Sequence, residues 1–315
     1  MTAVESLADS RNVAMRGIAW MVVSGIGYSI NAGLVKQLSS DLNTMEIVFW
    51  RSVIATIILL PFLFKHIGST GQDSLKNWHL FLLRGLFTYL AMGATYYALA
   101  KMPIADVYAL QFTLPLFMIL AAILFLGEKA RVGSWVACIV GFIGTLIILR
   151  PGFETITIAA LAALASAVLY SCTNIFIKKL SRTESTTTIT VFGNLVMVVL
   201  ALIPLLFAWR LPPVHTIGWI IALGVFTTAG QWALARAIAT ADARIVWPFD
   251  FLRMPFTVGV GYVMFGQLPG LWTWVGAVVI FGAAYYVIRE EAVARGPRTI
   301  VKPTKLPQTE TKNDD

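Results

Sequence analysis

Charged residues are scarce in this chain. Only 13% of its 315 residues are Asp, Glu, Lys or Arg, whereas 58% are hydrophobic, and the mean hydropathy is +0.77. Soluble domains carry about 25% charged and about 45–50% apolar residues. A chain with so few polar residues cannot cover an apolar core with a polar surface. The composition therefore excludes a soluble globular protein and indicates an integral membrane protein.

Several kinds of chemistry are also missing. The only cysteines are Cys138 and Cys172, and both lie in apolar runs, which excludes a disulfide framework and a cysteine metal site. The sequence has no G-x-x-x-x-G-K-[ST] phosphate loop and no H-E-x-x-H zinc motif, and its three histidines are scattered. No nucleophile, base and orienting group occur together. We therefore expect no cofactor, no metal and no catalytic residues, and we predict that the protein is not an enzyme.

What the chain does contain is a series of long apolar runs. A helix needs roughly 20 apolar residues to cross the hydrocarbon core of a membrane. In lipid only helices and closed barrels satisfy their backbone polar groups, and no alternating strand pattern is present. We predict an all-α membrane protein with ten transmembrane helices, at 17–36, 44–64, 78–100, 103–126, 132–149, 156–178, 186–208, 217–239, 244–265 and 271–288.

The distribution of Lys and Arg predicts an orientation. Outside the apolar runs these residues fall mainly on the side of the N-terminus, which by the positive-inside rule is the cytoplasm. This bias explains the net charge of +8, so we expect membrane lipid and not nucleic acid as a partner. Ten crossings place both termini in the cytoplasm. The short connectors favour a bacterial inner membrane.

The two halves of the chain resemble each other. GYSINAGLVKQLS, which begins at Gly27, has a near copy in LYSCTNIFIKKLS, which begins at Leu169. Because each half contains five helices, the second half must enter the membrane inverted, as in many alternating-access transporters. We predict a cytoplasmic N-terminal tail at 1–15, a first five-helix repeat at 16–152, an inverted second repeat at 153–290 and a disordered cytoplasmic tail at 291–315.

The end of the first half resembles a known family. Its features are Ala98-Leu99, the turn from Pro103 to Ala105, the mid-helix Pro115 to Phe117, and Leu126 to Glu128. These resemble an EamA-type repeat of the drug/metabolite transporter superfamily. The second half keeps several of the same features, but Gln267 replaces the Glu. The segments FWRSVIATIILLP and LLRGLF are similar to the branch that holds S-adenosylmethionine-uptake permeases. This resemblance implies a ten-helix bundle with a central cavity lined by the third, fourth, eighth and ninth helices.

Charged residues inside the runs are the first candidates for a substrate site, because burying them in a membrane is costly. Asp250 and Arg253 lie three residues apart, so they share a helix face. Arg253 would take a substrate anion, and Asp250 would meet a substrate amine or carry a coupling proton; the alternative is a mutual salt bridge that stabilises the bundle. For Arg51 and Arg84 we expect ion pairs, with substrate contact as the alternative. Arg236 is expected to extend to the membrane interface.

Uncharged residues form a second group of candidates. Gln111 and Gln231 lie on helices that the resemblance assigns to the cavity. Aromatic residues, chiefly Tyr96, Tyr108 and Trp247, would stack on a ring or bind a cation, although most aromatic residues in such a chain pack or lie at the interface. Pro115, Pro248 and Pro255 are candidate hinges, because proline frees backbone carbonyls and permits bending.

We predict a secondary active transporter for a small polar or zwitterionic metabolite, such as an amino acid or an S-adenosylmethionine-like compound. One alternative is an exporter of drugs or apolar cations with the same fold. A third hypothesis, an intramembrane lipid-modifying enzyme or a non-transporting receptor, is disfavoured by the repeat and by the missing catalytic set.

Overall fold

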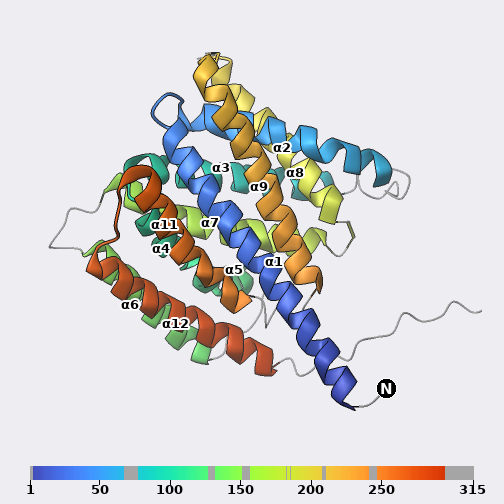
Figure 1. Cartoon of the computed structure of the whole chain (residues 1–315), viewed down its shortest axis with the longest axis vertical. Coiled ribbons are helices and arrows are strands. Elements are labelled where there is room, and N and C mark those ends of the chain that lie inside the picture. The colour runs from blue at the N-terminus through green and yellow to red at the C-terminus, as the bar shows by residue number, and fades with distance from the viewer. Residues whose placement is uncertain are drawn as a thin grey trace, which may run out of the picture.

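The computed structural model describes residues 3–66, 77–126, 132–150, 157–181, 183–184, 186–207, 211–240 and 247–294. Within these ranges every regular element is a helix (Figure 1), which confirms the predicted all-α fold. The first half contains α1 (Ala3–Leu38), α2 (Thr44–His66), α3 (Trp78–Lys101), α4 (Ile104–Gln111), α5 (Leu114–Leu126) and α6 (Val132–Leu149). The second contains α7 (Ile158–Leu180), α8 (Thr186–Leu205), α9 (Val214–Thr240), the 3-10 helix η3 (Trp247–Leu252), α11 (Arg253–Phe265) and α12 (Leu271–Ala294).

Two predicted helices are each divided into two pieces, and this corrects the sequence prediction. The run at 103–126 becomes α4 and α5, and the described part of the run at 244–265 becomes η3 and α11. Pro115 is the second residue of α5 and Pro255 is the third residue of α11. A proline lacks the N–H that would continue a helix, and in a first turn that N–H has no partner. Each proline is thus accommodated by starting a new helix.

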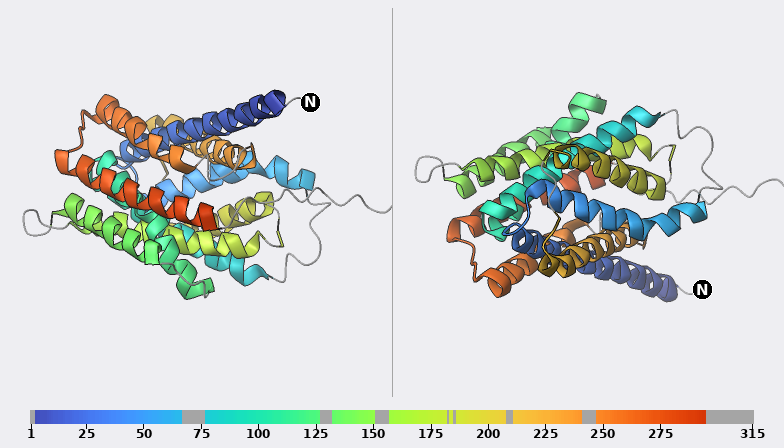
Figure 2. Two further views of the ribbon diagram at one scale, coloured as in Figure 1. Left: turned by 90° about the horizontal axis from the view of Figure 1, so that it is seen from below. Right: turned by 90° about the horizontal axis from the view of Figure 1, so that it is seen from above.

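The packing partners of the two halves correspond. α1 lies along α9, and α7 lies along α3; α2 packs against α8, α6 against α12, and α4 against α11 (Figures 1 and 2). Exchanging α1 with α7, α2 with α8, α3 with α9, α4 and α5 with η3 and α11, and α6 with α12 reproduces the same pairs. The bundle is therefore built from two equivalent five-helix repeats whose helices interleave.

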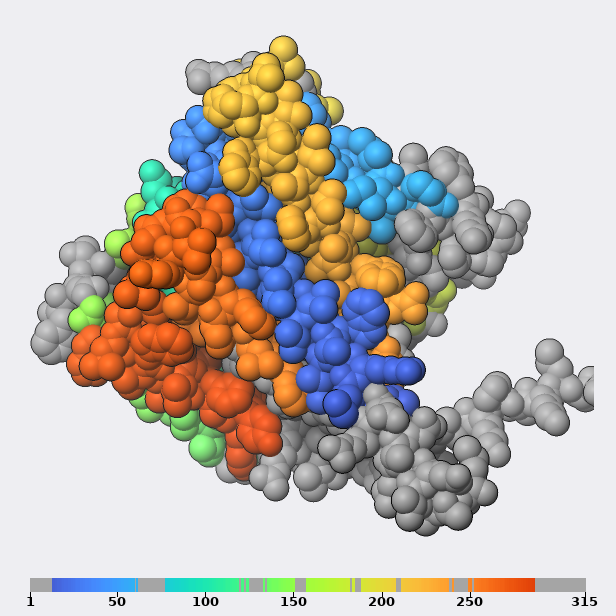
Figure 3. Space-filling model, in the orientation of Figure 1, coloured from blue at the N-terminus to red at the C-terminus, as the bar shows by residue number. Residues whose placement is uncertain are grey.

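Glycine permits a close approach of α1 and α9. A Cβ atom on Gly27 of α1 would lie 3.2 Å from the Cα of Gly230 on α9. Next to this point the Ser24 hydroxyl donates a hydrogen bond to the Gly230 carbonyl at 3.0 Å. Small residues let helix backbones approach closely in membranes. Figure 3 shows the result on one face, where α1 lies between α9 and α11.

Among the described residues, four stretches are long and apolar enough to cross a membrane: Val13–Leu38, Ile158–Leu180, Thr188–Leu205 and Val214–Ala237. Shorter apolar helices occupy Ile104–Met118, Trp135–Leu149 and Leu271–Tyr286.

Candidate functional site

The break before α11 brings two charged side chains into the bundle. Arg253 Nη2 donates to Asp250 Oδ1 at 2.6 Å, and the two side chains keep only 17% and 16% of their surface exposed. The Arg253 guanidinium also lies over the ring of Tyr28, 4.8 Å from its centroid, and 5.8 Å from the centroid of Tyr108. The salt bridge that the sequence offered as one alternative is therefore formed, and two aromatic rings from α1 and α4 contact the cation.

Hydroxyl groups fix the start of α11 on α1. The Thr257 hydroxyl donates to the backbone carbonyl of Arg253 at 2.7 Å, and the Ser29 hydroxyl lies 3.3 Å from the same oxygen and 3.0 Å from the Thr257 hydroxyl. A Cβ on Gly25 would lie 3.6 Å from the Arg253 Cα, so the two backbones are in van der Waals contact. The position of the Arg253 side chain thus depends directly on α1.

A second arginine, Arg51 on α2, is almost completely buried at 3% exposure. Its Nη1 lies 3.2 Å from the Met92 sulfur, and its Nε has no hydrogen-bond partner. No carboxylate of the described residues forms an ion pair with it, so the ion pair expected for Arg51 is not found. Its charge lies within electrostatic range of the hydroxyls of Tyr28, Tyr96 and Tyr170.

Amide and hydroxyl groups connect helices beside the tyrosines. Tyr96 on α3 is only 5% exposed, and Asn31 on α1 donates its amide N–H to the Thr227 hydroxyl on α9. Thr88 on α3 donates to the Thr173 hydroxyl on α7 at 3.5 Å. Hydrogen bonds between side chains therefore link α1 with α9 and α3 with α7 inside the bundle.

Gln111, the last residue of α4, extends this network. Its Nε2 donates to the hydroxyl of Thr95 at 2.7 Å and to the hydroxyl of Ser166 at 2.9 Å. The network thus reaches the break between α4 and α5, just as Arg253 marks the break before α11.

Other predicted site residues lie elsewhere or remain undescribed. Arg84 Nη1 donates to the Ile189 carbonyl of α8 at 2.6 Å, and its contacts among the described residues do not include the Arg253 cluster. The Oε1 atom of Gln231 is buried without a hydrogen-bond partner. The side chains of Trp247 and Pro248 fall outside the described part of the chain, although their backbones belong to η3.

Comparison with known proteins shows the family to which this chain belongs. The model of the EamA-like transporter family matches residues 15–150 and again residues 157–289. The chain belongs to this family. EamA-family proteins are integral membrane transporters, so the chain is a membrane transporter of small molecules and not an enzyme.

Curated relatives from bacteria agree with this assignment. The chain is 34% identical over 292 residues to a riboflavin transporter of Rhizobium johnstonii, covering 91% of this chain and 95% of the relative. It is 32% identical to a riboflavin transporter of Vibrio cholerae, with coverage of 91% and 97%. It is 28% identical to an S-adenosylmethionine uptake transporter of Rickettsia felis, also with coverage of 91% and 97%.

A solved crystal structure shares the fold. It aligns with 92% of this chain and 99% of its own, with a TM-score of 0.56 and 14% sequence identity. At this identity the match supports the EamA-type architecture alone.

Sequence reasoning missed several members of the central network of this EamA transporter. Tyr170, Thr95 and Ser166 were not selected as site residues, although the repeat offered a signal: Tyr170 is the counterpart of Tyr28. The hydroxyl residues gave no signal, because serine and threonine are common in membrane helices and only the packing shows which of them meet Gln111.

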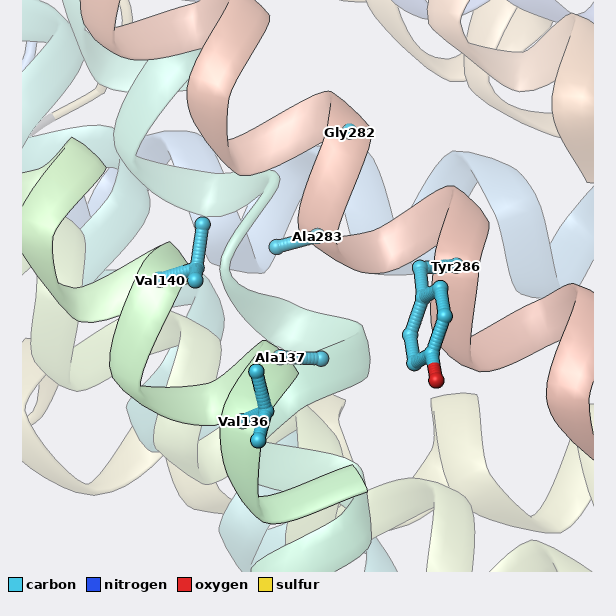
Figure 4. A pocket seen from close by; sticks show the side chains of 6 residues that line it. All are labelled: Val136, Ala137, Val140, Gly282, Ala283 and Tyr286. Atoms are coloured by element: carbon cyan, nitrogen blue, oxygen red, sulfur yellow. The ribbon is translucent and has the colours of Figure 1, made fainter. Parts of the chain in front are cut away.

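A cavity of about 240 Å³ lies away from this network, between α6 and α12. Figure 4 shows its lining, which comes from Val136, Ala137 and Val140 of α6 and Gly282, Ala283 and Tyr286 of α12. Apart from the Tyr286 hydroxyl, these side chains are apolar, so they suit a lipid chain or another helix better than a polar metabolite.

Proposed function

We propose that this EamA-family protein is a secondary active transporter that binds a small polar metabolite at the central network and moves it by alternating access. The observation that carries the proposal is the burial of two arginines, a carboxylate and four tyrosines where the two repeats interleave. Buried ionisable groups in a membrane protein are costly, and they are retained mainly where they have a function. Arg253, Asp250, Arg51, Gln111, Tyr96 and Tyr108 are the proposed contacts.

The chemistry of the network supports a particular kind of cargo. Riboflavin and S-adenosylmethionine, the cargoes named for the relatives, each carry a planar nitrogen heterocycle attached to hydroxylated carbons. Tyrosine rings provide faces on which a heterocycle stacks, and amides and hydroxyls such as those of Gln111 and Thr95 provide hydrogen bonds for its edges. We therefore extend the expected zwitterionic cargo to planar heterocyclic metabolites, charged or uncharged.

The two repeats account for the conformational change of the proposed transport cycle. In the proposed cycle the segments 16–152 and 153–290 exchange conformations about a pseudo-twofold axis in the membrane plane, with the termini in the cytoplasm. The breaks at Pro115 and Pro255 act as hinges next to the site. Asp250 carries a coupling proton when it is released from Arg253.

An exporter of apolar cations is the competing function, and the density of aromatic rings favours it. The two buried arginines oppose it, because an apolar cation offers them no carboxylate or other acceptor group to bind.

A ligand-stabilisation assay on the purified protein separates the two functions. A ligand at 100 times its Kd stabilises the folded state by about 2.7 kcal/mol, which appears as a rise in melting temperature. We expect riboflavin or S-adenosylmethionine to raise the melting temperature and tetraphenylphosphonium to leave it unchanged. Tyr108→Leu should abolish the rise, whereas Arg236→Gln, a change at an exposed arginine that stacks on Trp232, should preserve it. Stabilisation by tetraphenylphosphonium alone would reverse the assignment, and an unchanged response in Tyr108→Leu would refute the site.

A further inference from the structure

The two buried arginines of the central network, Arg51 and Arg253, differ in the groups that balance their charges. Arg253 has a carboxylate partner at 2.6 Å and two aromatic rings, so its charge is balanced within the protein. Arg51, at 3% exposure, has a methionine sulfur beside its Nη1 and no carboxylate partner among the described residues, whereas a buried, unpartnered Nε is common to both arginines. A sulfur is only a weak acceptor.

Glu46, the acid closest to Arg51 along α2, forms no ion pair with it, and its Oε1 is buried without a hydrogen-bond partner. Glu46 Oε2 instead accepts a hydrogen bond from the backbone N–H of Asn43 at 2.8 Å, at the start of the helix. A buried charge without a partner is unfavourable unless something else neutralises it or accepts its hydrogen bonds. In a binding protein that partner is the ligand.

We infer that Arg51 is the subsite for the electron-rich edge of the substrate, because it lacks the carboxylate partner that balances the charge of Arg253 in this state. This inference rests on the proposed function and narrows it. The Arg51 guanidinium presents planar N–H donors that match two neighbouring oxygens, as in a carboxylate or in a pair of carbonyl groups on a heterocycle. Tyr28, Tyr96 and Tyr170, whose hydroxyls interact electrostatically with Arg51, provide the faces for the ring. The substrate class is therefore a planar heterocycle or amino acid derivative with an acceptor edge.

Riboflavin binding to Arg51 variants tests this subsite, with Arg236→Gln as the matched control for the loss of one arginine. A hydrogen bond to a charged group contributes about 1.5–3 kcal/mol, equivalent to roughly 10- to 150-fold in Kd. We expect Arg51→Gln to weaken binding by at least about tenfold, and Arg51→Lys, which keeps the charge without the fork, to weaken it less. Arg236→Gln should bind like the wild type.

The ligand-free melting temperature distinguishes a binding role from a structural one. Because Arg51 is uncompensated without ligand, Arg51→Gln should melt at the same or a higher temperature than the wild type while it loses affinity. Binding within twofold of the wild type would overturn the inference. A large fall in the ligand-free melting temperature, with Arg51→Lys binding normally, would also overturn it. If the wild type binds neither riboflavin nor S-adenosylmethionine, the proposed function fails first.

A different set of contacts lies at the end of the bundle where α1 ends, which is called here one mouth of the bundle. There the Lys36 ammonium donates to the carbonyls of Leu99 at 3.0 Å and Met102 at 2.6 Å, and it lies 5.8 Å from the centroid of the Phe265 ring. These bonds connect the ends of α1, α3 and α11 (Figure 2, where the loop between α11 and α12 lies at the end of the bundle away from the N-terminus).

Two further contacts close the same end. The Ile104 N–H donates to Gln267 Oε1 at 3.4 Å, and the Thr273 hydroxyl donates to Asp106 Oδ1 at 2.8 Å. They bind the start of α4 to the α11–α12 connection and to α12. One mouth of the bundle is thus sealed by side chains from both repeats.

We propose that Lys36 is the latch of the sealed mouth: its hydrogen bonds hold the ends of α1 and α3 together, and their loss lets this mouth open during the cycle. Lysine suits this role because its three N–H donors bind several helix-end carbonyls at once and its charge favours a helix C-terminus. A substitution that removes these donors therefore shifts the balance between states toward the one that is open at this mouth.

Spin-label distances at the two mouths test the latch. In a background with Cys138→Ala and Cys172→Ala, one label pair replaces Ser40 and Lys101 at the sealed mouth. The other replaces Ser181 and Arg236 at the opposite mouth. Lys36→Met should add a longer distance at the sealed mouth and a shorter one at the opposite mouth, and Lys36→Arg, which keeps the donors, should restore the parent distribution.

The latch is wrong if Lys36→Met leaves both distributions unchanged, or if Lys36→Arg shifts them as far as Lys36→Met does. If Lys36→Met does not yield folded protein, Lys36→Gln replaces it with the same expected direction.

Discussion

Removing the Asp250 carboxylate tests how the central network is stabilised. Breaking a buried ion pair by deleting one partner costs about 3–5 kcal/mol, because the other charge is left uncompensated. Both side chains keep about a sixth of their surface exposed, as the 17% and 16% values show, and Arg253 retains the rings of Tyr28 and Tyr108. Each cation–π contact recovers about 0.5–1 kcal/mol. We therefore expect Asp250→Asn to lower the free energy of unfolding by about 2–3 kcal/mol, below the full cost of breaking a buried pair.

A double-mutant cycle isolates the pair. Asp250→Asn, Arg253→Gln and the double variant are unfolded with SDS in mixed micelles, and their free energies of unfolding are compared with that of the wild type. The double variant should be more stable than the sum of the single changes predicts, by at least about 1.5 kcal/mol. A coupling energy within about 0.5 kcal/mol of zero, the range found for independent sites, would show that the two charges do not stabilise each other.

Three further substitutions test other parts of the structure by the same unfolding assay. Gly193→Ala should be destabilising, because its Cβ would clash with Nη1 of Arg84 and displace that group from the Ile189 carbonyl; Gly218→Ala, which has open space at its Cβ, is the control and should be near neutral. Gly266→Ala should cost about 1–2 kcal/mol, since φ is +64° at this helix end; no loss would contradict the left-handed backbone there. Gln111→Leu should reduce substrate binding but cost less than about 1 kcal/mol of stability, because the hydroxyls it contacts also bond to carbonyls of their own helices; normal binding would remove it from the site.

Much of the fold was predictable because the membrane imposes simple rules. Long apolar runs, short connectors and the repeat at Tyr28 and Tyr170 were sufficient to predict helices in two five-helix units. The breaks at Pro115 and Pro255 were expected only as bends. Whether a proline bends a helix or starts a new one depends on the contacts that neighbouring helices make there, such as those of Ser29 and Gly25 with the Arg253 backbone, and that is a property of the packing.

The candidate site was predictable in composition but not in its connections. Asp250 and Arg253 could be paired from their spacing alone. For Arg51 the spacing was uninformative, and the ion pair expected there is replaced by a sulfur contact and an unpartnered nitrogen. Which long-range groups surround a buried charge depends on contacts between distant helices, and a single sequence does not contain this information.

Uptake into proteoliposomes tests the central claim most directly. Purified protein is reconstituted, and the internal concentration of labelled riboflavin, and separately of labelled S-adenosylmethionine, is followed over time with an imposed pH gradient and without one. We expect one of these compounds to accumulate above its external concentration only when the gradient is present, and Tyr108→Leu to abolish the accumulation. If protein-containing vesicles take up both compounds no faster than empty vesicles, whichever way the gradient is directed, the account of this chain as a secondary transporter for such metabolites is contradicted.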